Sequence, residues 1–335
     1  MRMEQEKMQK IIRWGIIGIG KIAEKFATDL TTIKNAELYA VASTSLERAK
    51  DFAIRYNAPC FYDSYESIFQ TPDLDVIYIA TPHTSHAQNT ILCLKNKMPV
   101  LCEKPFAINL KQVQRMVESA RENDTFLMEA MWSRFIPAIN KTLDLIAENR
   151  IGKVKTLHAD FGFVAPNLPE RRLLNPNLGG GALLDIGVYP AYLSLLLLGY
   201  PTDIKAISNF GSTGIDETTS FILGYKNNAT AVLSCTLNAR TRTEALIYGE
   251  TGYIHIEGRF MDARKITLHE TDKKPIIFRF PRKTIGYNFE IEEVNKCLRE
   301  GKKQSDKMPL SMSVKLISLL DEIRQKAGII YEGID

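Results

Sequence analysis

The chain has 335 residues, of which 45% are hydrophobic and 24% charged, a composition typical of a globular protein large enough for two domains. Its formal net charge of +4 comes from 43 basic and 39 acidic residues spread along the sequence. Nucleic-acid-binding proteins concentrate Lys and Arg in patches, so this mild excess argues against a nucleic-acid partner and suits a pocket for a small anionic ligand.

The first third of the sequence alternates short apolar runs with longer segments of helical periodicity. The apolar runs predict strands at residues 11–17, 36–42, 76–80, 100–102 and 126–128. The segments between them predict helices at residues 21–30, 46–56, 85–97 and 110–123. Such alternation predicts a parallel sheet, and strands that are apolar throughout indicate helices on both faces. We therefore expect a doubly wound α/β domain over residues 1–132.

The second part of the chain has a different pattern. Its helices are predicted at residues 137–149, 288–299 and 310–326, and a long apolar helix follows a glycine triplet at 179–181. A loop rich in Pro, Asn and Arg precedes the triplet, at residues 165–178. Strands are predicted at residues 153–164, 204–210, 218–225, 230–237, 244–249, 253–257, 265–269 and 275–280. Short turns between them predict an α+β domain over residues 133–335 with an open, mainly antiparallel sheet.

Targeting and disulfide signals are weak in this sequence. Five cysteines are scattered along it, and none lies in a Cys-x-x-Cys pair, so neither a disulfide framework nor a zinc cage is indicated. The charged N-terminus does not continue into an apolar stretch of the signal-peptide type. The apolar run at residues 193–198 is too short to cross a bilayer. We expect a soluble cytoplasmic protein with no membrane partner.

A glycine-rich turn lies between the first predicted strand and the first predicted helix. Gly18, Gly20 and Ala23 have the spacing G-x-G-x-x-A. In this context Gly18 permits the tight turn, and Gly20 lets the backbone approach a pyrophosphate. Backbone amides at the start of the helix, at Lys21 and Ile22, would point at the phosphates. The turn therefore predicts dinucleotide binding on a Rossmann fold, and a purely structural bend is the alternative.

The residues after the second predicted strand bear on the choice of cofactor. An acidic residue there would bind the ribose 2′-hydroxyl of NAD, but the sequence has Ser43, Thr44 and Ser45. Arg48 and Lys50 follow on the next predicted helix. Hydroxyl groups with nearby cations suit the extra phosphate of NADP, so we expect NADP in preference to NAD. Two cations that are simply exposed on the helix are the alternative.

Two further stretches carry chemically versatile side chains. Glu103, Lys104 and Pro105 follow a buried strand, at the sheet edge where open α/β proteins bind ligands. Asp185 and Tyr189 are four residues apart on the predicted apolar helix and would share one of its faces. Burying a carboxylate and a phenol without partners costs several kcal/mol. The two groups therefore have either a functional role or one another as hydrogen-bond partners.

Together, these motifs resemble the glucose–fructose oxidoreductase / inositol dehydrogenase / rhizopine-catabolism (Gfo/Idh/MocA) family of NAD(P)-dependent oxidoreductases. The likeness runs from residues 13–18 through 103–105 to the glycine-triplet helix. Residues 128–135 and 185–189 look most like the branch of dimeric dihydrodiol dehydrogenases and NADP-dependent xylose dehydrogenases. Many other members carry His where this chain has Tyr189, which argues against substrates of the inositol type.

The resemblance implies hydride transfer between nicotinamide C4 and a hydroxyl-bearing carbon of a sugar or cyclic diol, or the matching carbonyl. It assigns Tyr189 as general base in oxidation and general acid in reduction, with Asp185 orienting the substrate or Lys104. An unperturbed tyrosine has a pKa of about 10, so the nearby ammonium of Lys104 would bring it towards operating pH. A non-catalytic dinucleotide-binding regulator or sensor on the same fold is the alternative function.

The resemblance also places Thr81, Pro82, His83 and His86 near the nicotinamide and its ribose, together with Glu103. The two histidines, three residues apart, could instead suggest a metal site. No Asp, Glu or Cys follows them at a suitable spacing, so we expect no metal.

Four more residues have two interpretations each. Trp132 and Arg134 are expected to wall the cofactor cleft, and a core Trp with a surface Arg is the alternative. Arg171 and Arg172, in the loop before the glycine triplet, contact either substrate or solvent.

The predicted second sheet also bears on partners. An antiparallel sheet with helices on one side leaves its other face open, and Val232 and Leu233 lie in one of its candidate strands. The resemblance implies that two such faces pack as a homodimer, with larger assemblies left open. A small polyhydroxylated molecule is the expected substrate.

Overall fold

The computed structural model describes residues 10–331, which form two compact units. The first unit contains residues 10–107, Lys111–Trp132 and Lys283–Val314. The second contains Ile108–Leu110, Ser133–Arg282 and residues 315–331. This division differs from a single cut at residue 132, because a late segment of the chain returns to the first unit.

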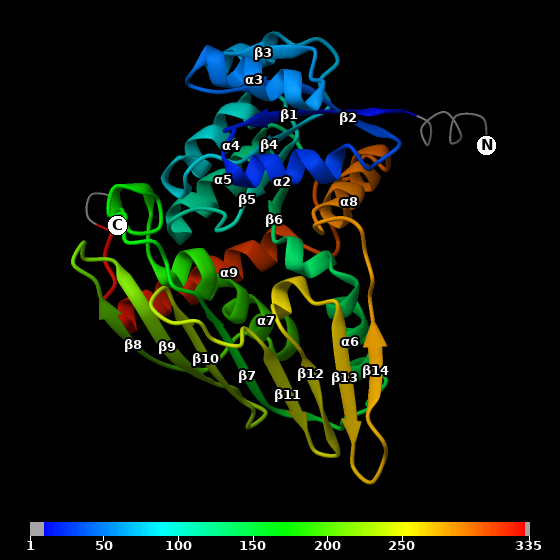
Figure 1. The fold of residues 1–335 in the computed structure, drawn as a ribbon, viewed down its shortest axis with the longest axis vertical. Helices are drawn as coiled ribbons and strands as arrows, with labels where there is room; N and C mark the ends of the chain where they lie inside the picture. The colour runs from blue at the N-terminus through cyan, green and yellow to red at the C-terminus, as the bar shows by residue number, and fades with distance from the viewer. Residues whose placement is uncertain (1–9, 332–335) are drawn as a thin grey trace. The chain divides into compact units, whose positions relative to one another are not determined.

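The described part of the first unit is built on a six-stranded sheet in the order β3-β2-β1-β4-β5-β6 (Figure 1). Its strands are β1 (Ile12–Ile17), β2 (Ala36–Ala42), β3 (Cys60–Tyr62), β4 (Val76–Ile79), β5 (Val100–Glu103) and β6 (Leu127–Ala130). All neighbouring strands are parallel. Every residue of β4, β5 and β6 is buried, as the uninterrupted apolar runs indicated. The strand order confirms the predicted doubly wound Rossmann fold.

Helices cover this sheet. They are α2 (Lys21–Leu30), α3 (Leu46–Tyr56), α4 (His86–Lys95), α5 (Leu110–Glu122) and α8 (Asn288–Arg299), with the 3₁₀ turns η1 (Glu66–Gln70) and η2 (His83–Ser85). Helix α8 packs beside α2 despite its distance in sequence (Figure 1). The buried Trp14 indole nitrogen on β1 also donates to Asn295 Oδ1 on α8, at 3.0 Å. These contacts explain why the segment 283–314 belongs to the first unit.

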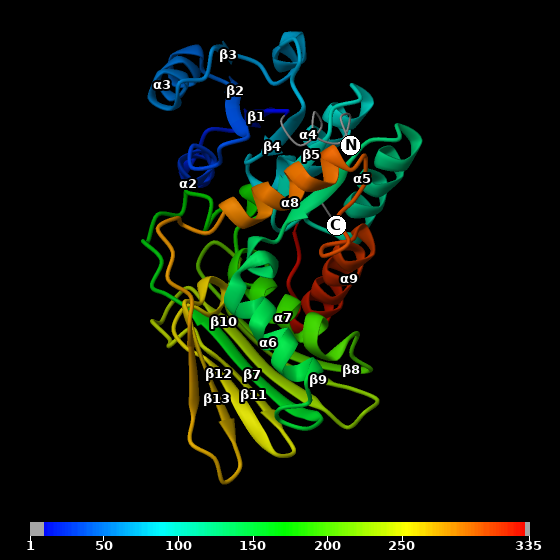
Figure 2. The same ribbon diagram turned by 90° about the vertical axis from the view of Figure 1, so that its right-hand side faces the viewer.

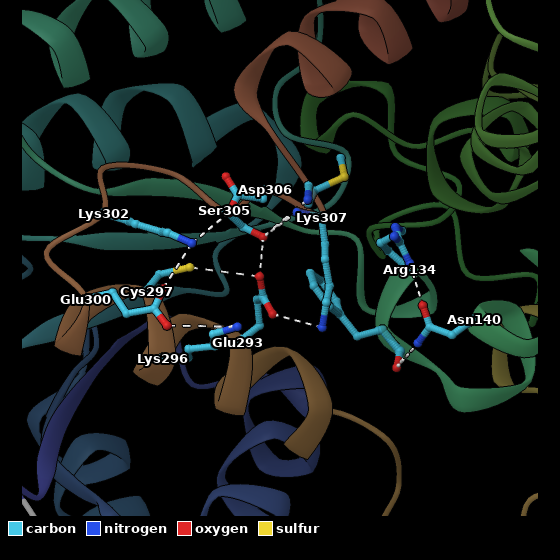
Figure 3. A network of polar contacts seen from close by, with 12 residues as sticks. Arg134, Asn140, Glu293, Lys296, Cys297, Glu300, Lys302, Ser305, Asp306 and Lys307 are labelled. Atoms are coloured by element: carbon cyan, nitrogen blue, oxygen red, sulfur yellow. Dashed lines mark hydrogen bonds and ion pairs between the residues drawn. The ribbon is translucent and has the colours of Figure 1, made fainter. Parts of the chain in front are cut away.

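A polar network fixes the chain that follows α8 (Figure 3). The buried Glu293 carboxylate accepts the Ser305 hydroxyl at 2.6 Å and pairs with the Lys307 ammonium at 3.1 Å. Nearby, the Lys302 ammonium donates to Asp306 at 2.7 Å. The loop between α8 and α9 is therefore held by a side chain of α8 and by side chains of the loop itself, all within the first unit.

The second unit contains, among its described residues, an eight-stranded sheet in the order β14-β13-β12-β11-β7-β10-β9-β8. Its strands are β7 (Val154–Gly162), β8 (Asp203–Phe210), β9 (Asp216–Gly224), β10 (Thr230–Thr236), β11 (Ala245–Gly249), β12 (Gly252–Ile256), β13 (Lys265–Glu270) and β14 (Ile276–Arg279). Strands β7 and β10 run parallel, and the other neighbours run antiparallel. The predicted α+β domain with a mainly antiparallel sheet is confirmed.

Helices pack on one face of this sheet. They are α6 (Pro137–Ala147), α7 (Val188–Leu198) and most of α9 (Leu310–Ala327), with short turns η3 (Trp132–Phe135), η4 (Pro176–Leu178) and η6 (Phe260–Asp262). Helix α7 contacts β7 and β10, and α6 contacts β13 (Figure 2). Apolar side chains are also exposed on β8, β9 and β10, including Ile207 at 69%, Ile222 at 48% and Val232 at 42%, whereas Leu233 is buried. Ile222 lies directly opposite Val232 in the β9–β10 register.

The most apolar helical stretch of the described chain is Pro176–Leu198, with a mean hydropathy of 1.6. It is longer than the run 193–198 considered above, and by length and composition alone it could cross a membrane. However, 83% of its apolar window is buried inside the protein. It is therefore the core helix of the second unit.

The helix after the glycine triplet is not a regular α-helix throughout. Leu183–Gly187 forms a π-helical turn, and α7 begins only at Val188. Pro190 has no amide hydrogen for an intrahelical bond, and the wide turn lies just before it. Asp185 thus lies in the π turn and Tyr189 in α7. A spacing of four residues is close to one full turn in a π-helical as in an α-helical stretch, so the expectation that the two residues share a face stays a prediction.

Candidate active site

The predicted cofactor residues of the first unit gather at one edge of its parallel sheet. Parallel strands end at the same edge, and the segments that follow β1, β2, β4, β5 and β6 therefore lie along it. These segments contain Gly18, Gly20, Lys21 and Ile22; Ser43, Thr44 and Arg48; Thr81, Pro82, His83 and His86; Glu103 and Lys104; and Trp132. Asp185, Tyr189 and Arg134 belong to the second unit.

The glycine turn after β1 fits a dinucleotide. Gly18 has a φ of +88°, and a Cβ there would lie 2.8 Å from the backbone of Ala80 and Thr81, so only glycine fits. At Gly20 a Cβ would meet none of the described atoms within 4 Å, which leaves open space beside the backbone. Gly20 is also the N-cap of α2 and supplies no side-chain cap for its first amides. An anionic pyrophosphate would satisfy these amides at the helix N-terminus.

The residues after β2 divide into structural and exposed groups. The buried Ser43 hydroxyl accepts the Ser45 amide at 3.3 Å, and the Ser45 hydroxyl caps α3 by accepting the Arg48 amide at 3.4 Å. Thr44 and the Arg48 side chain are exposed. The half-buried Tyr65 lies near this segment and was not among the predicted cofactor residues. Burial raises the pKa of its phenol, and the nearby Arg48 charge lowers it.

His86 connects two segments of this edge. Its ring is fully buried, with Nδ1 2.8 Å from the Pro105 carbonyl oxygen and Nε2 2.9 Å from the Thr81 carbonyl oxygen. The His83 ring lies 5.7 Å away, centroid to centroid. No group of three or more His, Cys, Asp or Glu residues placed to hold a metal occurs within residues 10–331. The contacts of His86 tie the segment after β4 to the segment that carries Lys104.

Glu103, the last residue of β5, is held by its neighbours. Its buried carboxylate accepts the Tyr78 hydroxyl and, through Oε2, the Lys104 amide at 3.1 Å. The Tyr78 ring stacks on Phe26 with centroids 3.7 Å apart. Burial, and after it the Glu103 charge, raises the pKa of Tyr78 well above its usual value. Tyr78 is therefore a permanent donor that fixes Glu103 and, through it, the backbone of Lys104.

Two further buried acids of the first unit belong to none of the motifs from which the site residues were predicted. Glu129 on β6 accepts the Phe106 amide at 3.2 Å, and burial raises the pKa of its carboxyl to about 7. Glu290 on α8 is fully buried. Burial first, and then the Glu103 and Asp29 charges, raises the pKa of Glu290 well above its usual value.

Trp132 forms part of an aromatic pair. Its buried indole stacks on the Tyr287 ring, with centroids 5.0 Å apart and an interplanar angle of 10°. Tyr287 is the N-cap of α8 and also contacts the edge of Phe26 at 6.5 Å. Sequence reasoning missed Tyr287, because no local pattern links the start of α8 to the end of β6.

Arg134 lies just beyond Trp132 and belongs to the second unit. Its guanidinium donates to Asn140 Oδ1 in the first turn of α6, at 2.6 Å (Figure 3). The Asn140 amide nitrogen in turn donates to the Phe135 carbonyl oxygen at 3.2 Å. The start of α6 thus fixes the direction of this side chain.

In the second unit, an ion pair ties the long loop to the π turn. Arg172 Nη1 lies 2.8 Å from Asp185 Oδ1, and the Asp185 side chain is nearly buried. Arg171, its neighbour, is exposed. Tyr189 is only 6% exposed, and its ring centroid lies 5.8 Å from that of Phe161 on β7. Arg172 is therefore an ion-pair partner of Asp185. From the sequence alone, contact with substrate and contact with solvent were equally open for this side chain.

Comparison with known proteins identifies the family. The model of an oxidoreductase family with an NAD-binding Rossmann fold, Gfo/Idh/MocA, matches residues 12–131, and the model of that family's C-terminal domain matches residues 139–255. The chain belongs to the Gfo/Idh/MocA family. It is 36% identical over 330 residues to trans-1,2-dihydrobenzene-1,2-diol dehydrogenase of Danio rerio, covering 96% of this chain and 98% of that protein. The Homo sapiens enzyme of the same name is 32% identical over 329 residues, with the same coverage.

Solved structures share the fold of this family member. Aldose-aldose oxidoreductase from Caulobacter crescentus has a TM-score of 0.87 at 21% identity, covering 95% of this chain and 98% of that one. KijD10, a 3-ketoreductase from Actinomadura kijaniata solved with NADP and TDP-benzene, has a TM-score of 0.84 at 26% identity, covering 94% and 98%. Further KijD10 structures carry a tyrosine-to-phenylalanine or a lysine-to-alanine substitution. Family membership confirms the predicted enzyme class, an NAD(P)-dependent dehydrogenase or reductase.

Proposed function

We propose that the protein transfers a hydride between nicotinamide C4, preferably of NADP, and a hydroxyl-bearing carbon of a sugar or cyclic diol, or the matching carbonyl. The observation that carries this proposal is that a family member with a glycine turn open to a dinucleotide has Lys104 directly after β5 and a nearly buried Tyr189 in α7. Relatives named trans-1,2-dihydrobenzene-1,2-diol dehydrogenase, at 32–37% identity, support a diol or sugar substrate.

Side chains of the protein transfer the proton of the substrate hydroxyl. When bound, the nicotinamide ring supplies the hydride acceptor or donor. In oxidation, Tyr189 as phenolate takes the hydroxyl proton of the substrate while the carbon loses its hydride and the C=O bond forms; in reduction, Tyr189 returns the proton. Lys104 donates a hydrogen bond to the reacting oxygen, and its charge favours the phenolate form. Asp185, paired with Arg172, orients the substrate.

The preference for NADP rests on the segment after β2. No acidic side chain occupies residues 43–45, and Thr44 and Arg48 are exposed at the end of the sheet where the adenosine ribose binds in this fold. Arg48 pairs its charge with a 2′-phosphate. The structure of KijD10 with NADP supports the same choice.

A second copy of the chain is the expected protein partner. Ile207, Ile222 and Val232 present exposed apolar side chains on the adjacent strands β8, β9 and β10 of the second sheet. A homodimer would remove this patch from water, since patches of this kind mark association surfaces. All five cysteines are free thiols, which supports the cytoplasm as the location.

Two substitutions test the catalytic roles. We expect Tyr189→Phe and Lys104→Met to abolish turnover while NADPH still binds, measured by nicotinamide absorbance and by NADPH fluorescence. Tyr200→Phe and Lys95→Met are matched controls, because both side chains are exposed and lie outside the site. Full turnover in both site variants would refute the assigned roles. Cofactor binding by the wild type with no turnover on any sugar or diol would favour a dinucleotide-binding regulator.

A further inference from the structure

A buried carboxylate outside every motif holds the start of the segment that carries Asp185 and Tyr189. Asp216, the first residue of β9, is 0% exposed. Its Oδ2 accepts the backbone amide of Leu183 at 2.7 Å and the Thr219 hydroxyl at 2.9 Å. Leu183 begins the π turn, which contains Asp185 and continues directly into α7. The contact is therefore an N-terminal cap on this π turn and helix.

The glycine triplet is shaped to receive this carboxylate. Gly181 has a φ of +124°, and a Cβ there would overlap the Asp216 carboxylate. On the adjoining residue, the Gly180 carbonyl oxygen accepts the buried Tyr331 hydroxyl at 2.9 Å. The Arg324 guanidinium on α9 lies 5.0 Å from the Tyr331 ring centroid. Groups from β9, α9 and the chain after α9 thus converge on the residues just before the π turn.

The charge of Asp216 bears on the strength of this cap. A carboxylate at a helix N-terminus accepts backbone amides more strongly than a neutral acid, because the helix dipole favours negative charge there. Burial raises the pKa of Asp216 to about 7, against the opposing effects of the Leu183 amide, the Thr219 hydroxyl and the Arg324 charge. Cys235 on β10 also faces it, and burial and the Asp216 charge raise the pKa of that thiol. The cap therefore strengthens as pH rises through about 7.

We propose that Asp216 is a positioning residue for the reaction: by fixing the Leu183 amide, it sets the orientation of the π turn, which carries Asp185, and of α7, which carries Tyr189. This inference rests on the proposed role of Tyr189. Small misplacements of reacting groups cost large factors in rate, on the order of 100-fold for about 1 Å. Loss of the cap therefore lowers kcat, whereas nucleotide affinity, which depends on the glycine turn of the first unit, stays the same.

Three variants test this inference by steady-state kinetics between pH 5 and 9. We expect Asp216→Ala to lower kcat by roughly 100-fold with the KM for NADP unchanged. Asp216→Asn keeps an oxygen that can accept the Leu183 amide but carries no charge, so its kcat at pH 9 lies between those of Asp216→Ala and the wild type. In the wild type, a plot of kcat against pH should have a rising limb near pH 7, where Asp216 ionises. Asp216→Asn should lack this limb. Asp203→Ala, which removes an exposed carboxylate from the neighbouring strand β8, is the control and stays near wild type.

The outcomes separate this inference from the proposed function. Wild-type kcat and pH profile in Asp216→Ala would overturn it. If Asp216→Ala fails to fold by circular dichroism, the Asp216→Asn profile decides, and an unchanged limb near pH 7 overturns the inference. Tyr189→Phe is measured in parallel. Normal turnover in that variant refutes the proposed function itself, whereas an inactive Tyr189→Phe beside wild-type Asp216 variants refutes the positioning role alone.

Discussion

The Asp29 carboxylate at the end of α2 lies 2.7 Å from the backbone nitrogen of Gly286 and accepts its hydrogen. The same carboxylate accepts the amides of Ile285, Tyr287 and Asn288 at 2.9, 2.8 and 3.3 Å. Four amides at the start of α8 are thus satisfied by one buried acid, in the arrangement that a helix dipole favours. This contact attaches α8 to the first unit and places Tyr287 against Trp132.

Removing the Asp29 carboxylate should therefore lower the stability of the fold. We expect Asp29→Ala to lower the free energy of unfolding by about 3 kcal/mol or more, because it leaves buried amides without an acceptor. Urea denaturation at pH 7 measures the change. Asp306→Ala is the matched control: its ion pair with Lys302 is exposed, so its loss changes the free energy of unfolding little. Equal costs for the two variants would contradict the anchoring role of Asp29.

The two glycines of the cofactor turn should respond differently to the same substitution. Gly18→Ala places a Cβ against the backbone of Ala80 and Thr81 at a positive φ, so the melting temperature should fall. Gly20→Ala meets open space and should fold normally, but it should weaken NADPH binding by about tenfold or more because the new methyl group occupies the approach to the pyrophosphate. Thermal melts and NADPH fluorescence titrations distinguish the two effects. Unchanged affinity in Gly20→Ala would place the pyrophosphate elsewhere.

Arg48 should determine the preference for NADP. Hydrogen bonds to charged groups contribute about 1.5–3 kcal/mol, so Arg48→Ala should raise the KM for NADP by about tenfold to hundredfold and leave the KM for NAD unchanged. Lys50→Ala, on the same helix and equally exposed, controls for the general effect of removing a positive charge. The same loss in Lys50→Ala, or a parallel loss with NAD, would rule out a specific contact with the 2′-phosphate.

Glu129 should make stability depend on pH in a defined direction. Burial raises the pKa of its carboxyl from 4.5 to about 7, so between these values the folded state binds more protons than the unfolded state. Its contribution to stability is therefore complete below pH 4.5 and is lost as pH rises to about 7, by at most about 3 kcal/mol. Glu129→Gln should remove this dependence, so its stability relative to wild type should increase over that range. Chemical denaturation at several pH values measures the difference, with the exposed Glu118→Gln as control; a constant difference would show that Glu129 is ionised in the fold.

Much of the first unit could be predicted from the sequence because its strands are buried on both faces and read as apolar runs. β3, with three residues at the sheet edge, left no such run. The return of α8 to this unit could not be predicted, because the partners of Asp29 are more than 250 residues away in sequence. The cofactor edge was accessible for a different reason: parallel strands end together, so residues after successive strands must lie near one another.

The supporting residues of the site required the tertiary structure. Tyr78 contacts Glu103 across neighbouring strands, and Arg172 reaches Asp185 from a loop without periodicity. Asp216 opens a strand where nothing local distinguishes a buried cap from a surface acid. The π turn was also hidden, because a helical pattern of apolar residues does not separate an α turn from a wider one.

The absorbance of reduced nicotinamide is the first measurement to make on the purified protein. NADP or NAD is supplied with a panel of aldoses, cyclic diols and inositols. We expect the absorbance to grow with one sugar or diol class, faster with NADP than with NAD, and to stay flat for Tyr189→Phe with the same substrate. A flat trace for the wild type across the whole panel, with NADPH still bound, would contradict hydride transfer to this substrate class.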